Sequence, residues 1–237
     1  GDARHPFGDI SVDGYSPFRQ ADRIFAMVTG DSAPPYVVTV DTVRQDDARH
    51  DYRWQAHTFK SVSGSGTVAD PFILDGSNAD LYVYFVQPER FVGSSGKWFS
   101  PYIQRDRNLV LAKQGGVVDG HFFTIHYPRK NGMPLPTITS SDSSSGYWAT
   151  IDWGSDREDY LLEKKSDSLT ATDVYSDALF AVVRTTGSLV DAFLVQEGSS
   201  VRYAGSVLLE VSASSSVSAS SSRTGPISSV DGSGISS

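Results

Sequence analysis

The chain contains no cysteine among its 237 residues, so a disulfide scaffold is excluded. It also lacks any stretch near the roughly 20 uninterrupted apolar residues of a membrane-spanning helix. Basic residues are outnumbered, with 20 Lys and Arg against 28 Asp and Glu, which gives a formal net charge of −8. This balance opposes bulk attraction to nucleic acid or to an anionic membrane, because both reward a dense field of Lys and Arg.

Several common catalytic motifs are absent too. The sequence has no GxSxG nucleophile elbow, no CxxC pair, no HExxH and no Gly-rich phosphate loop ahead of a helix. His121 and His126 stand five positions apart on one expected strand, which places them on opposite faces and prevents joint metal binding. Many carboxylates stand in turn sequences such as Asp75-Gly76, where they hydrogen-bond the local backbone. Glycosidase chemistry is neither indicated nor excluded, because sequence spacing does not give the distance between two carboxylates.

What the sequence does contain is the apolar period of β-strands. Short runs of alternating or β-branched apolar residues are separated by breaks rich in Gly, Ser, Asp and Pro. No 12-residue segment shows a helical stripe. The sequence therefore predicts an all-β protein, an antiparallel β-sandwich with little helix, formed as one domain by residues 1–211. The expected strands are Ile24–Thr29, Tyr36–Val43, Tyr52–Phe59, Leu81–Val86, Asn108–Lys113, His121–Tyr127, Tyr147–Trp153, Tyr160–Lys164, Ala178–Arg184, Asp191–Gln196 and Ser206–Val211.

Two of these runs indicate how the layers face the core. Tyr36–Val43 has β-branched residues on both faces, as in a strand buried between two layers. Tyr52–Phe59 instead alternates large rings with polar groups, as in a strand with one face in the core. The residues expected on inner faces are Val38, Val40, Trp54, Phe123, Ile125, Phe180, Val182 and Leu194.

Residues 212–237 differ in composition, with 13 Ser among 26 residues. Such a segment buries too little apolar surface to offset its ordering entropy, so it is predicted to be a Ser-rich C-terminal tail or linker. It either packs as an extended strip over the sandwich or leads to a further domain. The chain starts at Gly1 with no initiator Met, which favours a processed or excised product.

Some strand sequences resemble a known family. Pro35–Arg44 reads PYVVTVDTVR and His50–Thr58 reads HDYRWQAHT. They are similar to the "DYVVVVDRV" and "HxYxWxxH" strands in the C-terminal β-domain of heparinase II/III-type polysaccharide lyases. Phe122–Arg129 resembles that family's "FVTVLYPxR" strand, and Ala178–Arg184 followed by Phe193–Gly205 resembles its closing "FLVDGTSLxYxG" strands. These segments follow the family's order over most of residues 24–211.

The resemblance implies a secreted or periplasmic lyase in which a sheet-rich domain docks on an N-terminal (α/α) helical toroid. An anionic, uronate-containing polysaccharide is cleaved between them by β-elimination: the C5 proton of a uronate is removed and the 4-O-linked sugar leaves. No helical repeat occurs in this chain, so most catalytic groups are expected on a toroid outside it, and the chain alone is expected to be inactive. The alternatives are a non-catalytic carbohydrate-binding or structural β-sandwich of an extracellular protein, and a sandwich domain of a surface or assembly protein.

The resemblance also suggests a metal ligand. His5, ahead of Val12-Asp13-Gly14, is the nearest counterpart of a metal-binding His in the family's "HNTVxVDG" segment, although Pro-Phe replaces Asn-Thr. It implies a structural divalent metal, zinc or calcium, shared with a segment N-terminal to Gly1. The alternative is a terminal His in solvent.

Four further residues are candidates for contact with substrate. His57 is the candidate catalytic group, placed to contact a uronate, or else a polar cap on the core. Tyr15, Arg19 and Arg53 are candidate substrate-binding residues, an aromatic platform and a carboxylate clamp, because guanidinium binds carboxylate bidentately. The alternative for both arginines is solvation of a loop.

Overall fold

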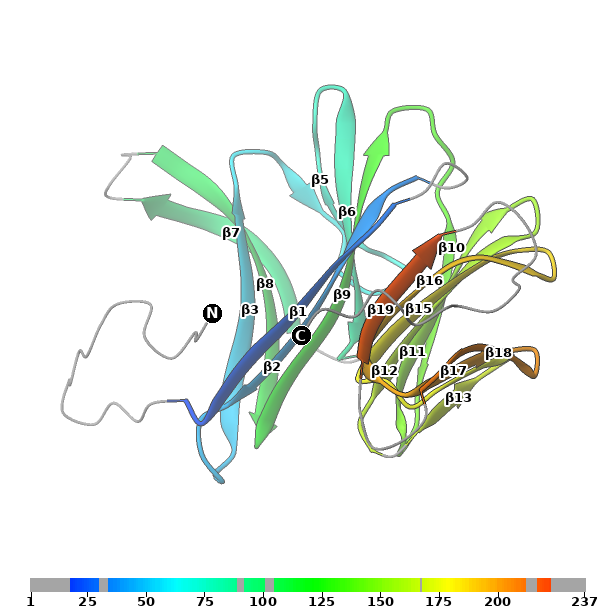
Figure 1. The fold of residues 1–237 in the computed structure, drawn as a ribbon. Helices are drawn as coiled ribbons and strands as arrows, with labels where there is room; N and C mark the ends of the chain where they lie inside the picture. Colours follow the sequence, from blue (N-terminus) through cyan, green and yellow to red (C-terminus); the bar gives the residue numbers. More distant parts are fainter. Residues whose placement is uncertain are drawn as a thin grey trace. The chain divides into compact units, whose positions relative to one another are not determined.

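The structure, a computed structural model, describes residues 18–29, 34–88, 92–100, 105–166, 168–211 and 217–222. Its regular elements are the strands β1 to β19, and every named pair of neighbouring strands is antiparallel (Figure 1). This confirms the predicted all-β class. No helix in the described part of the chain is long and apolar enough to cross a membrane.

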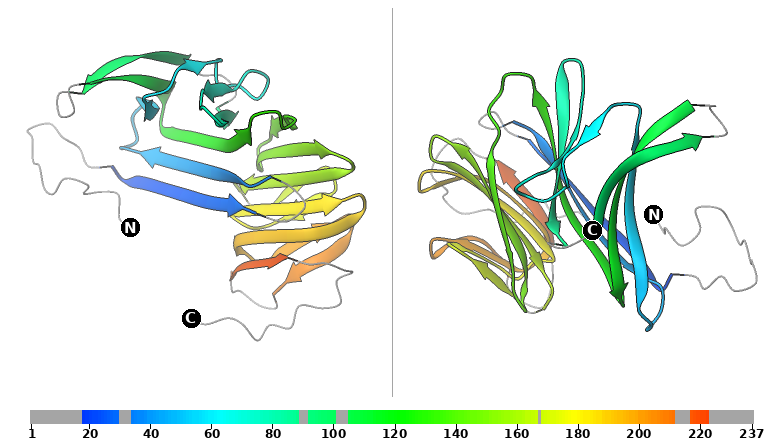
Figure 2. Two further views of the ribbon diagram at one scale, coloured as in Figure 1. Left: turned by 90° about the horizontal axis from the view of Figure 1, so that it is seen from above. Right: turned by 180° about the vertical axis from the view of Figure 1, so that it is seen from behind.

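The chain divides into two compact units, Gly1–Pro134 and Leu135–Ser237, here called unit 1 and unit 2. The sequence favoured a single sandwich over residues 1–211, whereas each unit contains two sheets of its own. The strands of both units can be followed from two further sides in Figure 2.

Unit 1 combines a six-stranded sheet of order β1-β2-β9-β6-β5-β4 with a three-stranded sheet of order β3-β8-β7. Both sheets contribute to one core cluster, which contains Tyr52, Phe72, Val83, Phe85, Val110, Ala112 and Phe122. β3 is an edge strand of the smaller sheet. The strands are β1 (Gln20–Val28), β2 (Tyr36–Arg44), β3 (His50–Thr58), β4 (Val62–Ser63), β5 (Phe72–Leu74), β6 (Ala79–Gln87), β7 (Val92–Ser100), β8 (Arg105–Val117) and β9 (Asp119–Lys130).

Unit 2 combines a six-stranded sheet of order β10-β11-β12-β15-β16-β19 with a four-stranded sheet of order β13-β14-β17-β18. Its core cluster includes Tyr160, Leu162, Val183 and Phe193 from the larger sheet. The strands are β10 (Thr137–Asp142), β11 (Gly146–Gly154), β12 (Arg157–Lys164), β13 (Leu169–Ala171), β14 (Val174–Ser176), β15 (Phe180–Thr186), β16 (Leu189–Gly198), β17 (Ser200–Tyr203), β18 (Ser206–Glu210) and β19 (Val217–Ser222).

β19 lies inside the Ser-rich segment that the sequence predicted to be a tail or linker. It pairs antiparallel with β16, from Ala192 opposite Ser222 to Gly198 opposite Val217, and forms an edge of the larger sheet. This part of the segment therefore follows the alternative of an extended strip added to the fold.

Six of the eight residues predicted for the core are buried. Their relative exposure ranges from 0% to 3%, and they are Val38, Val40, Phe123, Ile125, Phe180 and Val182. Trp54 and Leu194 are only half-buried. Trp54 stands on the edge strand β3, so it lacks a neighbouring strand on one side, whereas Leu194 stands on β16 between β15 and the edge strand β19.

Candidate functional site

Two of the candidate residues, Arg53 and His57, lie on the same exposed face of β3. Tyr52 is buried and Trp54 and Ala56 pack against the core cluster of unit 1. Because side chains alternate along a strand, the residues that alternate with Tyr52, Trp54 and Ala56 point to the opposite, exposed face of β3. We call the resulting exposed series, Asp51, Arg53, Gln55 and His57, the outer row of β3. The Cα atoms of successive members lie about 6.6 Å apart along the strand.

His57 was predicted to be catalytic or a polar cap on the core. It is the penultimate residue of β3, on the exposed face, opposite Leu109 in the strand register. The structure thus places it in the outer row with Arg53, within the same unit as Arg19.

A carboxylate is already bound at one end of the outer row. Lys113 Nζ lies 2.6 Å from Asp51 Oδ2, and the Gly116 N–H donates to Asp51 Oδ1 at 3.1 Å. Hydrogen bonding from Lys113, then from Gly116, with a smaller contribution from the charge of Arg53, lowers the pKa of the Asp51 carboxyl. Sequence reasoning missed both Asp51 and Lys113.

Arg53 stands directly opposite Lys113 in the β3–β8 register. Two like charges at such positions repel each other unless a counter-ion lies between them. Lys113 is neutralised by Asp51, whereas Arg53 makes no hydrogen bond or ion pair with another residue of the described ranges. Its guanidinium therefore remains available for a further carboxylate.

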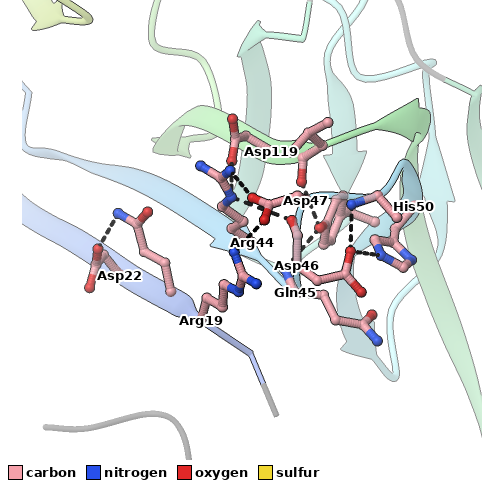
Figure 3. A network of polar contacts seen from close by, with 12 residues as sticks. Arg19, Asp22, Arg44, Gln45, Asp46, Asp47, His50 and Asp119 are labelled. Carbon is pink, nitrogen blue, oxygen red and sulfur yellow. Dashed lines mark hydrogen bonds and ion pairs between the residues drawn. The ribbon is translucent and has the colours of Figure 1, made fainter. Parts of the chain in front are cut away.

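Arg19, the other predicted clamp, holds a carboxylate of its own chain in the loop between β2 and β3 (Figure 3). Arg19 Nη1 lies 2.7 Å from Asp47 Oδ2, and Arg44 Nη2 lies 2.6 Å from Asp47 Oδ1. Hydrogen bonds from Arg19 and Arg44 lower the pKa of the Asp47 carboxyl. Arg44 Nε also lies 3.6 Å from Asp119 Oδ1. This loop is organised by its own ion pairs.

The same loop is also fixed by Asp46, which lies beside His50 in Figure 3. Asp46 Oδ1 lies 2.7 Å from His50 Nε2 and accepts the Ala48 N–H at 2.6 Å. The hydrogen bond with His50, followed by that with Ala48, lowers the pKa of the Asp46 carboxyl. These contacts hold the start of β3, and with it the outer row.

A second polar cluster lies on the face of β9 that contributes to the core of unit 1. His126 Nε2 lies 2.9 Å from Thr124 Oγ1, which lies 2.6 Å from Thr39 Oγ1. The Trp54 ring is 6.0 Å from the His126 ring between centroids. Burial, with a smaller contribution from the charge of Arg23, lowers the pKa of His126 to about 4. His126 is therefore neutral at physiological pH and serves the core as a hydrogen-bonded imidazole.

The remaining predicted residues, His5 and Tyr15, lie outside the described residues. Within the described ranges, no group of three or more His, Cys, Asp or Glu side chains is placed to hold a metal ion. The described donors therefore do not form a zinc or calcium site.

Comparison with known proteins adds no relative: no protein-family model matches the chain, and no curated protein matches it.

Proposed function

We propose that this chain is the substrate-binding β part of a lyase that cleaves an anionic, uronate-containing polysaccharide by β-elimination. The observation that carries the proposal is the outer row of β3, where Arg53 and His57 are exposed on one strand face and Arg53 has no described ion-pair partner. An extended strand face offers binding groups at regular intervals, which suits a linear polymer with a repeated carboxylate.

The segments similar to heparinase II/III lyases support the proposal by their position. Pro35–Arg44 corresponds to β2 and His50–Thr58 to β3, while Phe122–Arg129 lies within β9. The two later segments overlap β15 and the β16–β17 pair. Every similar segment thus overlaps at least one strand of the structure.

The distribution of charge favours unit 1 as the part that meets the polyanion. Unit 1 holds 14 Lys and Arg against 15 Asp and Glu, a net charge of −1, whereas unit 2 holds 6 against 13, a net charge of −7. Repulsion of an anionic chain is therefore weaker at unit 1. Within unit 1, the outer row adds the cation Arg53 at short range.

In this proposal the chain binds and orients the uronate units. Arg53 pairs with a carboxylate, and His57 lies about 13 Å further along the row, where it meets a later part of the polymer. The acid and base of the elimination come from an N-terminal (α/α) toroid, as a further domain or a partner chain. The protein acts outside the cytoplasm, secreted or periplasmic, and any divalent ion is bound through His5 together with groups outside the described residues.

A non-catalytic carbohydrate-binding sandwich is the second candidate. The exposed position of His57 on a strand face favours this candidate. A general acid or base is effective when it is held against the proton that it moves, and an exposed strand face suits binding better than such positioning. The two candidates differ in what happens when a toroid is supplied: the lyase part restores turnover, and the binding sandwich does not.

The test measures binding and turnover separately on the 237-residue chain. Titration calorimetry with oligosaccharides of alginate, hyaluronan and heparan sulfate is compared with neutral dextran, and ultraviolet absorbance detects the unsaturated product. We expect binding to at least one uronate polymer, weaker binding by Arg53→Gln, and no turnover. Absence of binding to all three polymers, or equal binding to dextran, would overturn the proposal, and robust turnover by this chain alone would show that it contains the catalytic groups.

A further inference from the structure

We infer that the bulge of β8 at Gly115 and Gly116 is a carboxylate-binding site that Asp51 fills until a uronate carboxylate displaces it. The inference rests on the proposed function, because it names the point at which the outer row of β3 receives the polymer. Asp51 then acts as an internal competitor that sets the affinity for the ligand.

The bulge follows from the strand register. His50 pairs with Val117 and Tyr52 with Gln114, so Gly115 and Gly116 of β8 together oppose the single residue Asp51 of β3. A bulge turns backbone groups out of the ladder and can re-aim them. Here it directs the Gly116 N–H at the Asp51 carboxylate, and Gly116 adopts a φ of 69°, in the left-handed region that favours glycine.

The absence of a side chain at Gly115 makes room for the carboxylate. A Cβ at Gly115 would lie 2.8 Å from Asp51 Oδ1 and 3.7 Å from its Cγ, so the carboxylate occupies the space that any other residue would fill. The site therefore consists of the Gly116 N–H, the Lys113 ammonium and the space left by the absent side chain of Gly115. Arg53 stands opposite Lys113 in the strand register.

The bound Asp51 carboxylate is open to replacement. Its side chain is 51% exposed and that of Lys113 is 34% exposed, so both reach solvent. Exposed ion pairs contribute little net free energy, so an external carboxylate that meets the same Lys113 ammonium, Gly116 N–H and Arg53 charge competes with Asp51 on similar terms. Asp51 carries the same functional group as a uronate, which commits the site to carboxylates as its ligand class.

The experiment compares four proteins by titration calorimetry with a uronate oligosaccharide that the native chain binds: native, Asp51→Ala, Gly115→Ala and the double variant Asp51→Ala/Gly115→Ala. Asp51→Ala vacates the site and is expected to tighten binding roughly 2- to 5-fold, the range that an exposed ion pair allows. Gly115→Ala places a methyl group in the space that the carboxylate occupies and should weaken binding. The double variant should lose the gain of Asp51→Ala.

Asp22→Asn is the matched control for charge. Asp22 is an exposed carboxylate of β1 that accepts from Gln20 Nε2 at 2.6 Å, so its replacement changes the charge of unit 1 by the same amount elsewhere. Asp51→Asn keeps the side-chain shape and serves as the second variant if Asp51→Ala does not fold. It should tighten binding, whereas Asp22→Asn should leave it unchanged.

The outcomes separate the inference from the function on which it rests. Binding by native protein with no gain in Asp51→Ala or Asp51→Asn overturns the inference and leaves the proposed function standing. An equal gain in Asp22→Asn also overturns the inference, because it would show a general charge effect. If neither the native chain nor any variant binds any uronate oligosaccharide, both fail.

Discussion

Arg184 and Asp159 form a buried, bidentate ion pair across β12 and β15. Arg184 Nε lies 2.7 Å from Asp159 Oδ1 and Nη2 lies 2.8 Å from Oδ2, and the side chains are only 2% and 0% exposed. Trp153 Nε1 donates to Oδ2 at 3.0 Å. Both charges are therefore held out of water by hydrogen bonds whose geometry depends on the strand register of unit 2.

Breaking this pair from one side should be costly. In Asp159→Asn the Arg184 guanidinium stays buried without its counter-charge, and we expect a loss of about 3–5 kcal/mol in the free energy of unfolding. Arg202→Gln, which removes the exposed pair with Glu210, should cost no more than about 1 kcal/mol. Urea denaturation of both variants checks the difference. Equal midpoints for the two would mean that the buried pair does not stabilise unit 2.

The second prediction concerns Trp54, which the structure places at the border of the core of unit 1. Its ring lies 5.2 Å from that of Phe85 in an edge-to-face arrangement. Because Trp54 is half-buried, Trp54→Ala should cost about 2–3 kcal/mol, below the 3–5 kcal/mol of a fully buried ring. Met27→Ala, a change of a side chain that is 60% exposed in the same unit, should stay within about 0.5 kcal/mol. A thermal melt in which both variants match native protein would contradict the position of Trp54 at the border of the core.

Much of the strand content could be predicted because apolar alternation is a local signal. Tyr36–Val43 was expected, and β2 covers Tyr36–Arg44. β7, with the sequence VGSSGKWFS, was not expected, because Gly and Ser interrupt its apolar period. Alternation also does not identify a strand's partner: β2 pairs with β9, about 80 residues away, as in Val38 opposite Ile125. Which strands share a sheet depends on such pairings, so apolar alternation alone does not predict the two compact units.

The candidate site was only partly predictable for the same reason. The alternation of His50–Thr58 placed Arg53 and His57 on the exposed face of one strand. It could not bring Lys113 beside Asp51, because their ion pair requires the β3–β8 register and its bulge. The adjacent Gly115 and Gly116 within a strand sequence are the signal that could have indicated the bulge. Arg19 looked available in the sequence because its partner Asp47 is 28 residues away.

The third prediction is a dependence of stability on pH caused by His126. Its pKa is about 4 in the folded protein against 6.5 as the reference value, so between these pH values the unfolded chain binds more protons. The contribution of neutral His126 to the free energy of unfolding is fully present above pH 6.5 and is lost as the pH falls toward 4. Lowering the pH from 7.5 to 5.5 should remove about 1 kcal/mol from the free energy of unfolding.

The groups charged near His126 are Arg23 of β1, which lowers its pKa, and Asp41 of β2, which raises it. These two pair with each other, with Nη2 to Oδ2 at 2.9 Å, so their opposing effects partly cancel and burial dominates. His126→Gln should reduce the loss between pH 7.5 and 5.5, measured by urea denaturation at both pH values. Identical losses in native protein and His126→Gln would assign the pH dependence to other groups.

The fourth prediction tests whether β19 protects the edge of unit 2. In the pairing with β16, Ala219 lies opposite Val195 and Ser220 opposite Leu194. Neighbouring residues of an edge strand direct their N–H groups alternately to the partner and to solvent, and proline has no N–H to donate. Of the two variants Ala219→Pro and Ser220→Pro, the one that removes an N–H bonded to β16 should disrupt the β16–β19 pairing and raise the amide exchange rates of β16. The other removes an N–H that points to solvent, so it should be tolerated and serves as the control. Unchanged exchange at β16 in both variants would show that β19 contributes no protection, and that the Ser-rich segment behaves as the tail that its composition suggests.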